Sequence, residues 1–291
     1  MKSIDIDRYN IEGMRDLIPP DVAENIGRTW YRGLVAGEEG NSAYRGILIW
    51  EYKNAGSDSM PTESEIVWAS GDEQKTLDLL FSGYNERIAE EHTVRSGFEF
   101  SFPPPEDAAR SFFPGEGFSL KETESRDIFV TVQELSDLKL SNKEVPFYIK
   151  AIDKLNTRQF RNGVVNCLYS GRKGLLEDMV WLSRDFFDQE VSACVVMDEK
   201  AQGFLLVHET ASGVLVVEFL FANSVEGNKD VLEMVRFSIR AAARKFPPET
   251  KVLLRRHNPS VKALVDKLFP GKKGAAAISG ERAEAEKGGA A

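Results

Sequence analysis

The sequence repeats short landmarks at a nearly constant distance, and this repeat limits the possible folds more than any other feature. Phe113-Pro114-Gly115 matches Phe269-Pro270-Gly271 at an offset of 156 residues, and Gly46-Ile47-Leu48-Ile49 matches Gly203-Phe204-Leu205-Leu206 at an offset of 157. Self-similarity at a fixed distance indicates a duplicated structural unit. The alternative is that two unrelated halves share a common helix ending. Because element order and spacing both agree, we interpret the 291 residues as two related domains.

Apolar periodicity and turn residues predict the same order of elements in both halves. In the first half they predict strands at 46–52, 65–69, 98–102 and 127–132, and helices from 72 and over 106–113. In the second half they predict strands at 203–208, 214–221 and 251–255, and helices over 229–246 and 258–269. Each half is therefore expected to form an α/β fold with a mixed sheet.

The domain boundary is expected where the sequence becomes polar and rich in turn residues, at 136–146. This gives an N-terminal domain of residues 1–138 and a C-terminal domain of residues 139–271. After Gly271 the chain consists mainly of Gly, Ala, Lys and Glu. Such a composition buries little apolar surface, so residues 272–291 are expected to be a disordered tail.

Charge is divided unevenly between the halves. Residues 1–135 have 13 basic and 26 acidic side chains, whereas residues 136–291 have 24 and 20. The net charge of −9 disfavours general binding to nucleic acid or anionic lipid. An anionic ligand is expected to prefer the second half.

Several classes of protein and site are excluded by what the sequence lacks. No segment reaches the roughly 18 apolar residues of a membrane span, and the first residues do not resemble a signal peptide. Cys167 and Cys194 are too few for a disulfide framework, which favours a reducing cytoplasm. The three histidines have no metal-ligand spacing, so no metal is expected. The glycine-rich dinucleotide, P-loop and hydrolase motifs are also missing.

The element order resembles the GNAT-type N-acetyltransferase fold, most clearly over Gln189–Gly271, and the whole chain resembles the tandem form with two such domains. The resemblance implies that acetyl-CoA, as co-substrate, binds where the fourth and fifth strands separate. It implies that Leu220, Phe221 and Ala222 of the fourth strand face the pantetheine arm. The pyrophosphate would meet the following helix N-terminus, where backbone N–H groups favour an anion. The implied loop residues are Asn223, Val225, Gly227, Asn228 and Lys229.

The sequence departs from the family pattern at two places. The expected loop has one glycine, Gly227, no arginine, and an acidic Glu226. Leu268 and Phe269 stand where the family has a tyrosine acid. Asn258 does resemble the asparagine found after the fifth strand, and it is included among the donor-binding candidates.

Glu218 is the first candidate for a general base, which must take a proton from the amine acceptor. It interrupts an otherwise apolar strand, where an unpaired charge is costly. The alternative is an exposed or salt-bridged glutamate without a catalytic task. His208, at the end of the preceding strand, is the second candidate, with a surface histidine as its alternative.

Acetyl-CoA-dependent transfer of an acetyl group to an amine of a small molecule or peptide is therefore the leading hypothesis. The C-terminal domain would bind the donor, and the N-terminal domain would be a degenerate copy. The rival is a non-catalytic binding or structural protein derived from the same fold. A generic two-domain α/β ligand binder is a third possibility. No nucleic-acid or membrane partner is expected, and the oligomeric state stays open.

Overall fold

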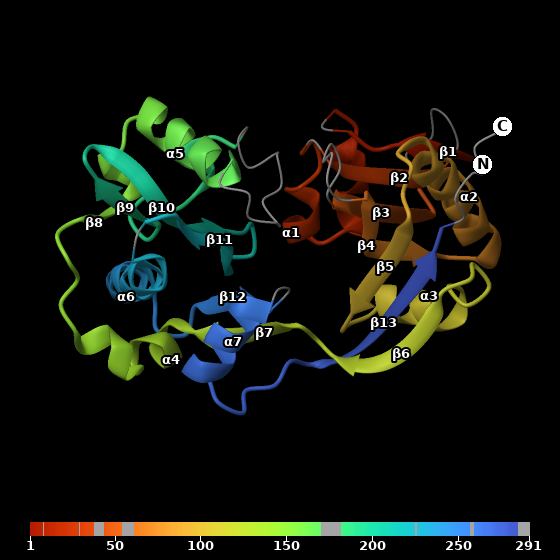
Figure 1. Cartoon of the computed structure of the whole chain (residues 1–291). Coiled ribbons are helices and arrows are strands. Elements are labelled where there is room, and N and C mark those ends of the chain that lie inside the picture. The colour runs from red at the N-terminus through yellow and green to blue at the C-terminus, as the bar shows by residue number, and fades with distance from the viewer. Residues whose placement is uncertain are drawn as a thin grey trace. The chain divides into compact units, whose positions relative to one another are not determined.

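The chain forms two structural units, each with its own sheet (Figure 1). The computed structural model describes residues 1–7, 9–28, 30–37, 44–53, 61–169, 182–224, 226–256 and 259–284. Unit 1 consists of Met1–Ser125 together with Ala275–Ala291, and unit 2 consists of Arg126–Gly274.

In unit 1 the described strands form a sheet in the order β1-β2-β3-β4-β5-β13-β6. Neighbouring strands are antiparallel except β4 and β5, which are parallel. Helix α2 (Gln74–Glu90) packs its apolar side on one face, with α3 (Pro105–Ser111), and η1 (Ile11–Leu17) and α1 (Pro20–Ala23) cover the other. The strands are β1 (Lys2–Asp5), β2 (Tyr31–Gly37), β3 (Gly46–Lys53), β4 (Glu63–Gly71), β5 (Arg95–Phe100), β6 (Ser119–Glu124) and β13 (Ala276–Ala283).

In unit 2 the described strands follow the order β7-β12-β11-β10-β9-β8, and β11 and β12 are the parallel pair. Helix α6 (Gly227–Lys245) and α4 (Val132–Ser136) lie on one face, and α5 (Thr157–Tyr169) lies on the other. The strands are β7 (Asp127–Thr131), β8 (Ile149–Ala151), β9 (Ala193–Met197), β10 (Lys200–Glu209), β11 (Leu215–Ala222) and β12 (Lys251–Arg255). The remaining helical segments are η2 (Lys139–Asn142), η3 (Ile152–Lys154), η5 (Arg184–Phe186) and α7 (Pro259–Leu268).

The two units repeat one arrangement down to single residues. A register shift falls between Ile49 and Trp50 in unit 1 and between Leu206 and Val207 in unit 2, so both shifts lie at the same offset of 157 as the sequence match. Gly46 and Gly203 also correspond. A Cβ on Gly46 would lie 2.8 Å from the Ser70 carbonyl oxygen, and one on Gly203 would lie 2.9 Å from that of Phe221. In both units any side chain at this position would collide with the backbone near the end of the paired strand, so the position requires glycine.

The domain boundary differs from the sequence expectation. The structure divides the chain between Ser125 and Arg126, not at 138/139, because β7 pairs with β12 of unit 2. The polar stretch at 136–146 is part of unit 2, where Leu138, Leu140 and Val145 pack against its core.

The expected disordered tail contains a strand. Residues 276–283 form β13, which lies between β5 and β6 in unit 1 and pairs with both (Figure 1). Hydrogen bonds on both edges, with Ala277 and Ile278 buried, replace the apolar bulk that the sequence lacks. Unit 1 thus takes a strand from beyond the sequence of unit 2, whereas unit 2 is one continuous segment.

Candidate functional site

Strand β11, which takes the place of the fourth strand in the family resemblance, separates from its parallel neighbour β12 after a short pairing. The two strands pair at Leu215–Val252 and Val216–Leu253, and β11 continues to Ala222. Both strands lie wholly within the described residues, and over Val217–Ala222 their register assigns β11 only β10 as a neighbour. This is the strand separation that the family resemblance predicts at a pantetheine site.

A β-bulge places Glu218 at the point of separation. Val207 lies opposite Val217 and Leu206 lies opposite Phe219, so Glu218 is the extra residue on β11. The bulge inverts the alternation of side chains. Val217 packs on the α6 face, and beyond the bulge that face receives Leu220 and Ala222, while Phe219 and Phe221 face α5.

Glu218 forms an ion pair across the opening. Its Oε2 lies 3.5 Å from Nη1 of Arg255, and its side chain is only 11% exposed. Since Val216 pairs with Leu253, Arg255 stands where the partner of Glu218 would be if the strands stayed together. The ion pair matches the salt-bridged alternative and also holds the carboxylate at the separation.

His208 is fixed by contacts of its own. Its Nδ1 lies 2.8 Å from the carbonyl oxygen of Phe186, so the hydrogen is on Nδ1 and donates to that oxygen. The imidazole stacks on the Phe186 ring at 4.0 Å between centroids. His208 pairs with Val216, so it lies on the strand beside Glu218.

The three β11 residues predicted to face pantetheine have side chains in the cores. Phe221 and Ala222 are buried, and Leu220 packs against the α6 cluster. Their backbone is therefore the part that a ligand would meet. The next residue, Asn223, is exposed and donates its N–H to the carbonyl of Gln202 at 2.6 Å.

The predicted pyrophosphate loop leads into the N-terminus of α6. Gly227 is the first helical residue, followed by Asn228 and Lys229, and the N-cap Glu226 makes no side-chain capping hydrogen bond. The Lys229 ammonium lies 2.5 Å from the Glu226 carboxylate. Val225 and Asn258 lie outside the described residues.

An internal acid lies at the same helix end. Asp230 is fully buried, accepts a hydrogen bond from the Tyr148 hydroxyl at 3.1 Å, and accepts another from the Ser224 hydroxyl. Neither Asp230 nor Tyr148 was among the sequence candidates. An aspartate in a first helical turn is ordinary, and Tyr148 is 82 residues away in sequence, so only the fold reveals the pair.

Unit 1 has the same bulge and separation with different side chains. Trp50 lies opposite Ile66 and Ile49 lies opposite Trp68, so Val67 is the extra residue. Strands β4 and β5 pair from Glu63–Arg95 to Ile66–Phe98, within the described part of the chain. Beyond that point, the Trp68 and Phe102 rings lie 6.0 Å apart and connect the two segments.

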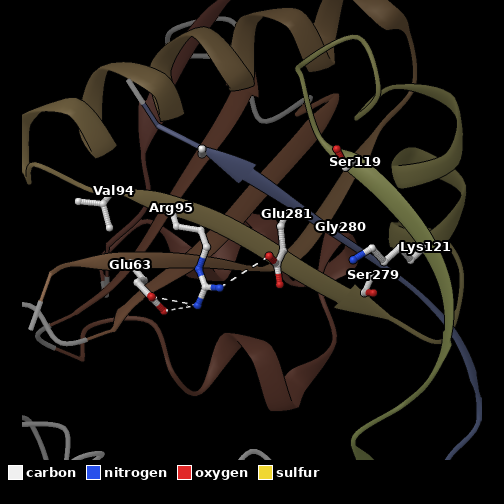
Figure 2. A pocket seen from close by; sticks show the side chains of 9 residues that line it. Glu63, Val94, Arg95, Ser119, Lys121, Ser279, Gly280 and Glu281 are labelled. Atoms are coloured by element: carbon white, nitrogen blue, oxygen red, sulfur yellow. Dashed lines mark hydrogen bonds and ion pairs between the residues drawn. The ribbon is translucent and has the colours of Figure 1, made fainter. Parts of the chain in front are cut away.

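A separate groove of about 700 Å³ lies on the sheet of unit 1, over β5, β13 and β6. Figure 2 shows Arg95 pointing toward Glu63 and Glu281 along its floor. The guanidinium is 2.9 Å from Glu63 and 3.6 Å from Glu281. The groove lies at neither the β4–β5 nor the β11–β12 separation, and β13 supplies part of its lining.

Other chemistries receive no support from the described residues. Burial raises the pKa of both Cys167 and Cys194 to about 12, so neither thiol is a nucleophile at neutral pH. Over the same residues, no group of three or more His, Cys, Asp or Glu side chains is placed to hold a metal ion. None of the described helices has the length and apolar character needed to cross a membrane.

No protein-family model matches the chain, and no curated protein matches it in sequence. Two solved structures are similar in fold. A tandem GNAT protein from the clavulanic acid biosynthesis pathway aligns with a TM-score of 0.59 and 11% identity, covering 98% of this chain and 99% of that one. A conserved protein of unknown function from Enterococcus faecalis V583, described as a probable N-acyltransferase, aligns with a TM-score of 0.51 and 10% identity, covering 97% of this chain and 72% of that one.

These likenesses confirm the fold prediction. The chain has an α/β fold similar to that of the tandem GNAT protein, with two units that each contain a mixed sheet. The duplication, the bulges and the paired strand separations are the features of this fold that bear on function.

Proposed function

We propose that this protein is an acetyl-CoA-dependent N-acyltransferase that transfers an acetyl group to an amine, with the donor in unit 2. The observation that carries the proposal is the early end of β11–β12 pairing after Val216. The rest of β11 offers a strand edge, and an extended ligand with amide groups binds such an edge as an added strand would. The pantetheine arm is a ligand of that kind.

The reaction is a direct transfer. The amine attacks the thioester carbon, a C–N bond forms, and the C–S bond breaks with its electron pair on sulfur. The amine loses a proton to a base, and the leaving thiolate takes up a proton to become the thiol. Backbone N–H groups of β11 would polarise the thioester carbonyl, and holding both reactants together supplies much of the rate.

Glu218 is proposed as the base that accepts the proton of the amine. The bulge presents it where the strands part, and the Arg255 guanidinium at 3.5 Å holds its carboxylate there. His208 is the second candidate, because a neutral imidazole with its hydrogen on Nδ1 has its basic lone pair on Nε2. Unit 1 has Val67 at the position of Glu218 and two aromatic rings at its separation, which supports a degenerate, non-catalytic role.

A second candidate function is a non-catalytic binding protein with the same fold. The acidic N-terminus of α6, with Glu226 and the buried Asp230, favours it. The two candidates differ in whether Glu218 matters for turnover.

The test uses the full chain. Acetyl-CoA should raise the melting temperature by mass action, and a panel of amines should be screened for thiol release. The Glu218→Gln variant should keep donor binding and lose activity about 10²-fold or more, the range for removal of a general base. Glu209→Gln, at the exposed end of β10, is the matched control and should keep activity. A chain that binds no acetyl thioester and transfers to no amine would contradict the proposal and favour the binding protein.

A further inference from the structure

Among the described strands, the sheet of unit 2 ends one strand earlier than the sheet of unit 1. In unit 1, β13 lies between β5 and β6 and pairs with both. In unit 2, β7 takes the equivalent place beside β12, but the sheet ends there, and none of the described strands pairs with its outer side. The outer side of β7 is therefore an open sheet edge.

The hydrogen bonds at the two ends of β7 show which of its backbone groups point outward. The Arg256 N–H donates to the Arg126 carbonyl at 3.1 Å. The Val132 N–H donates to the Thr250 carbonyl at 3.0 Å. Because hydrogen-bonded and non-hydrogen-bonded pairs alternate along an antiparallel ladder, the register of β7 and β12 makes Phe129 a member of a non-hydrogen-bonded pair. Its N–H and C=O point away from β12, and neither has a hydrogen-bonding partner within the described residues.

The side chains at the centre of β7 are apolar on both faces of the strand. Ile128 and Val130 are buried in the core of unit 2 beneath α6. On the other face Phe129 is 52% exposed, with the Lys251 ammonium 6.0 Å from its ring centroid. A strand added at this edge would extend the core on one face and cover the Phe129 ring on the other.

The other edge strands of the two sheets carry charges where β7 carries none. Strand β6 contains Lys121, Glu122 and Glu124, and β8 has Lys150 at its centre. Strand β1 has a charged residue at each end. Charged side chains on an edge strand hinder its pairing with another chain. The centre of β7 lacks this protection.

A second copy of β7 is complementary to this edge. Two β7 strands related by a two-fold axis at Phe129 would run antiparallel, with Phe129 opposite its counterpart and Ile128 opposite Val130 of the other copy. Aromatic and β-branched cross-strand pairs are favourable, and the outward N–H and C=O of the two Phe129 residues would bond to each other. We propose that two copies of this chain associate through the outer edges of β7, which joins their unit 2 sheets into one continuous sheet.

Sedimentation velocity on the full chain, from about 1 µM to about 1 mM, tests the proposal. We expect a monomer–dimer equilibrium in this range. Phe129→Lys should raise the Kd of the dimer by about tenfold or more, because it removes the aromatic pair and places like charges opposite each other. Phe147→Lys is the matched control, because Phe147 is 91% exposed in the same unit but lies beside β8 at the opposite edge of the sheet. This control should leave the Kd unchanged.

A cross-linking variant tests the register without adding a charge. Directly opposed Cα atoms of antiparallel strands lie about 4.5–5.5 Å apart, which a disulfide can span. Phe129→Cys should therefore give a covalent dimer on mild oxidation, whereas Phe147→Cys should not. The native thiols of Cys167 and Cys194 are buried and should not take part. A chain that stays monomeric at every concentration would overturn the proposal, and so would a dimer in which Phe129→Cys forms no cross-link. This second variant decides the matter even if Phe129→Lys fails to fold.

Discussion

Unit 1 and unit 2 share one backbone arrangement and differ in the side chains that it carries. Each has a bulged strand (β4 in unit 1 and β11 in unit 2), a parallel neighbour that pairs briefly with it, and a helix that follows it. The bulge residue is Val67 in unit 1 and Glu218 in unit 2, and the separation holds the Trp68–Phe102 contact in one unit and the Glu218–Arg255 ion pair in the other. The two units therefore share the backbone geometry of the bulge and the separation, and differ in the side chains at a few positions there.

The helix ends show that the charge of a whole unit is a poor guide to a local site. Unit 1 is the acidic half, yet the first turn of α2 has no acidic side chain. Unit 2 has the more basic sequence, yet the first turn of α6 contains the buried Asp230. A ligand responds to the few charges within about a Debye length, roughly 8–10 Å in ordinary salt.

Removing β13 should have the largest effect, because it should unfold unit 1 and leave unit 2 folded. Deletion of residues 275–291 takes β13 from between β5 and β6 and leaves every strand of unit 2 in place. Unit 1 should lose its native fold, and the fluorescence of Trp30, Trp50 and Trp68 should lose its cooperative transition. A chain lacking only 285–291 retains β13 and serves as the control. Unchanged unfolding after the full deletion would show that the first sheet does not need β13.

Gly46 and Gly203 occupy equivalent positions, so the same substitution can be tested in each unit. Gly46→Ala and Gly203→Ala should each lower the free energy of unfolding by about 1–3 kcal/mol, since the new Cβ meets fixed backbone at 2.8–2.9 Å. Denaturant titration measures this loss. Gly97→Ala is the control, because its Cβ would have only an ordinary contact at 3.5 Å. Equal stability of all three variants would refute the claim that Gly46 and Gly203 are both required by the close backbone contact.

Thiol labelling distinguishes unit 2 from unit 1, because both cysteines lie in unit 2 and three of the four tryptophans lie in unit 1. With pKa values of about 12 in buried sites, Cys167 and Cys194 should label far more slowly in the native chain at pH 8 than in the denatured chain. In the chain lacking 275–291 the labelling should stay slow while the tryptophan signal is lost. Rapid labelling of that variant would mean that the two units unfold together.

The smallest expected effect concerns the segment that leads out of unit 2. The Lys272 ammonium, followed by the Thr131 backbone, lowers the pKa of the Glu134 carboxyl, which also closes the capping box of α4. A lowered folded pKa gives stability that is present above the unfolded pKa of about 4.5 and is lost as pH falls through the folded pKa. Glu134→Gln should remove about 0.2–1 kcal/mol, the range for exposed pairs, and flatten the acid limb of a stability–pH curve. An unaltered acid limb would indicate that the ion pair contributes nothing.

Local patterns predicted most of the elements. Landmarks such as Gly46 and Gly203, and the apolar spacing of α2 and α6, depend on neighbours near in sequence, so the duplication and the fold class were predictable. The bulges were not, because a bulge is defined by the partner strand. The roles assigned to Glu218 and His208 stay predictions, with their contacts now known.

Strand β13 escaped prediction for a physical reason. In β13, small residues are required by packing: a Cβ on Gly280 would lie 2.5 Å from the Phe98 ring. The same small residues indicate a linker when their partners are unknown. Asp230 escaped for a related reason, since its partner Tyr148 is far away in sequence.

The position of β13 also affects the order of events during translation. Most of unit 1 precedes unit 2 in the sequence, but its sheet is completed by residues 276–283, which follow unit 2. N-terminal domains generally fold first as they are made, whereas here unit 2 is synthesised in full before unit 1 can close. Until then, the edges of β5 and β6 lack their shared partner, and unpaired strand edges can pair with another chain.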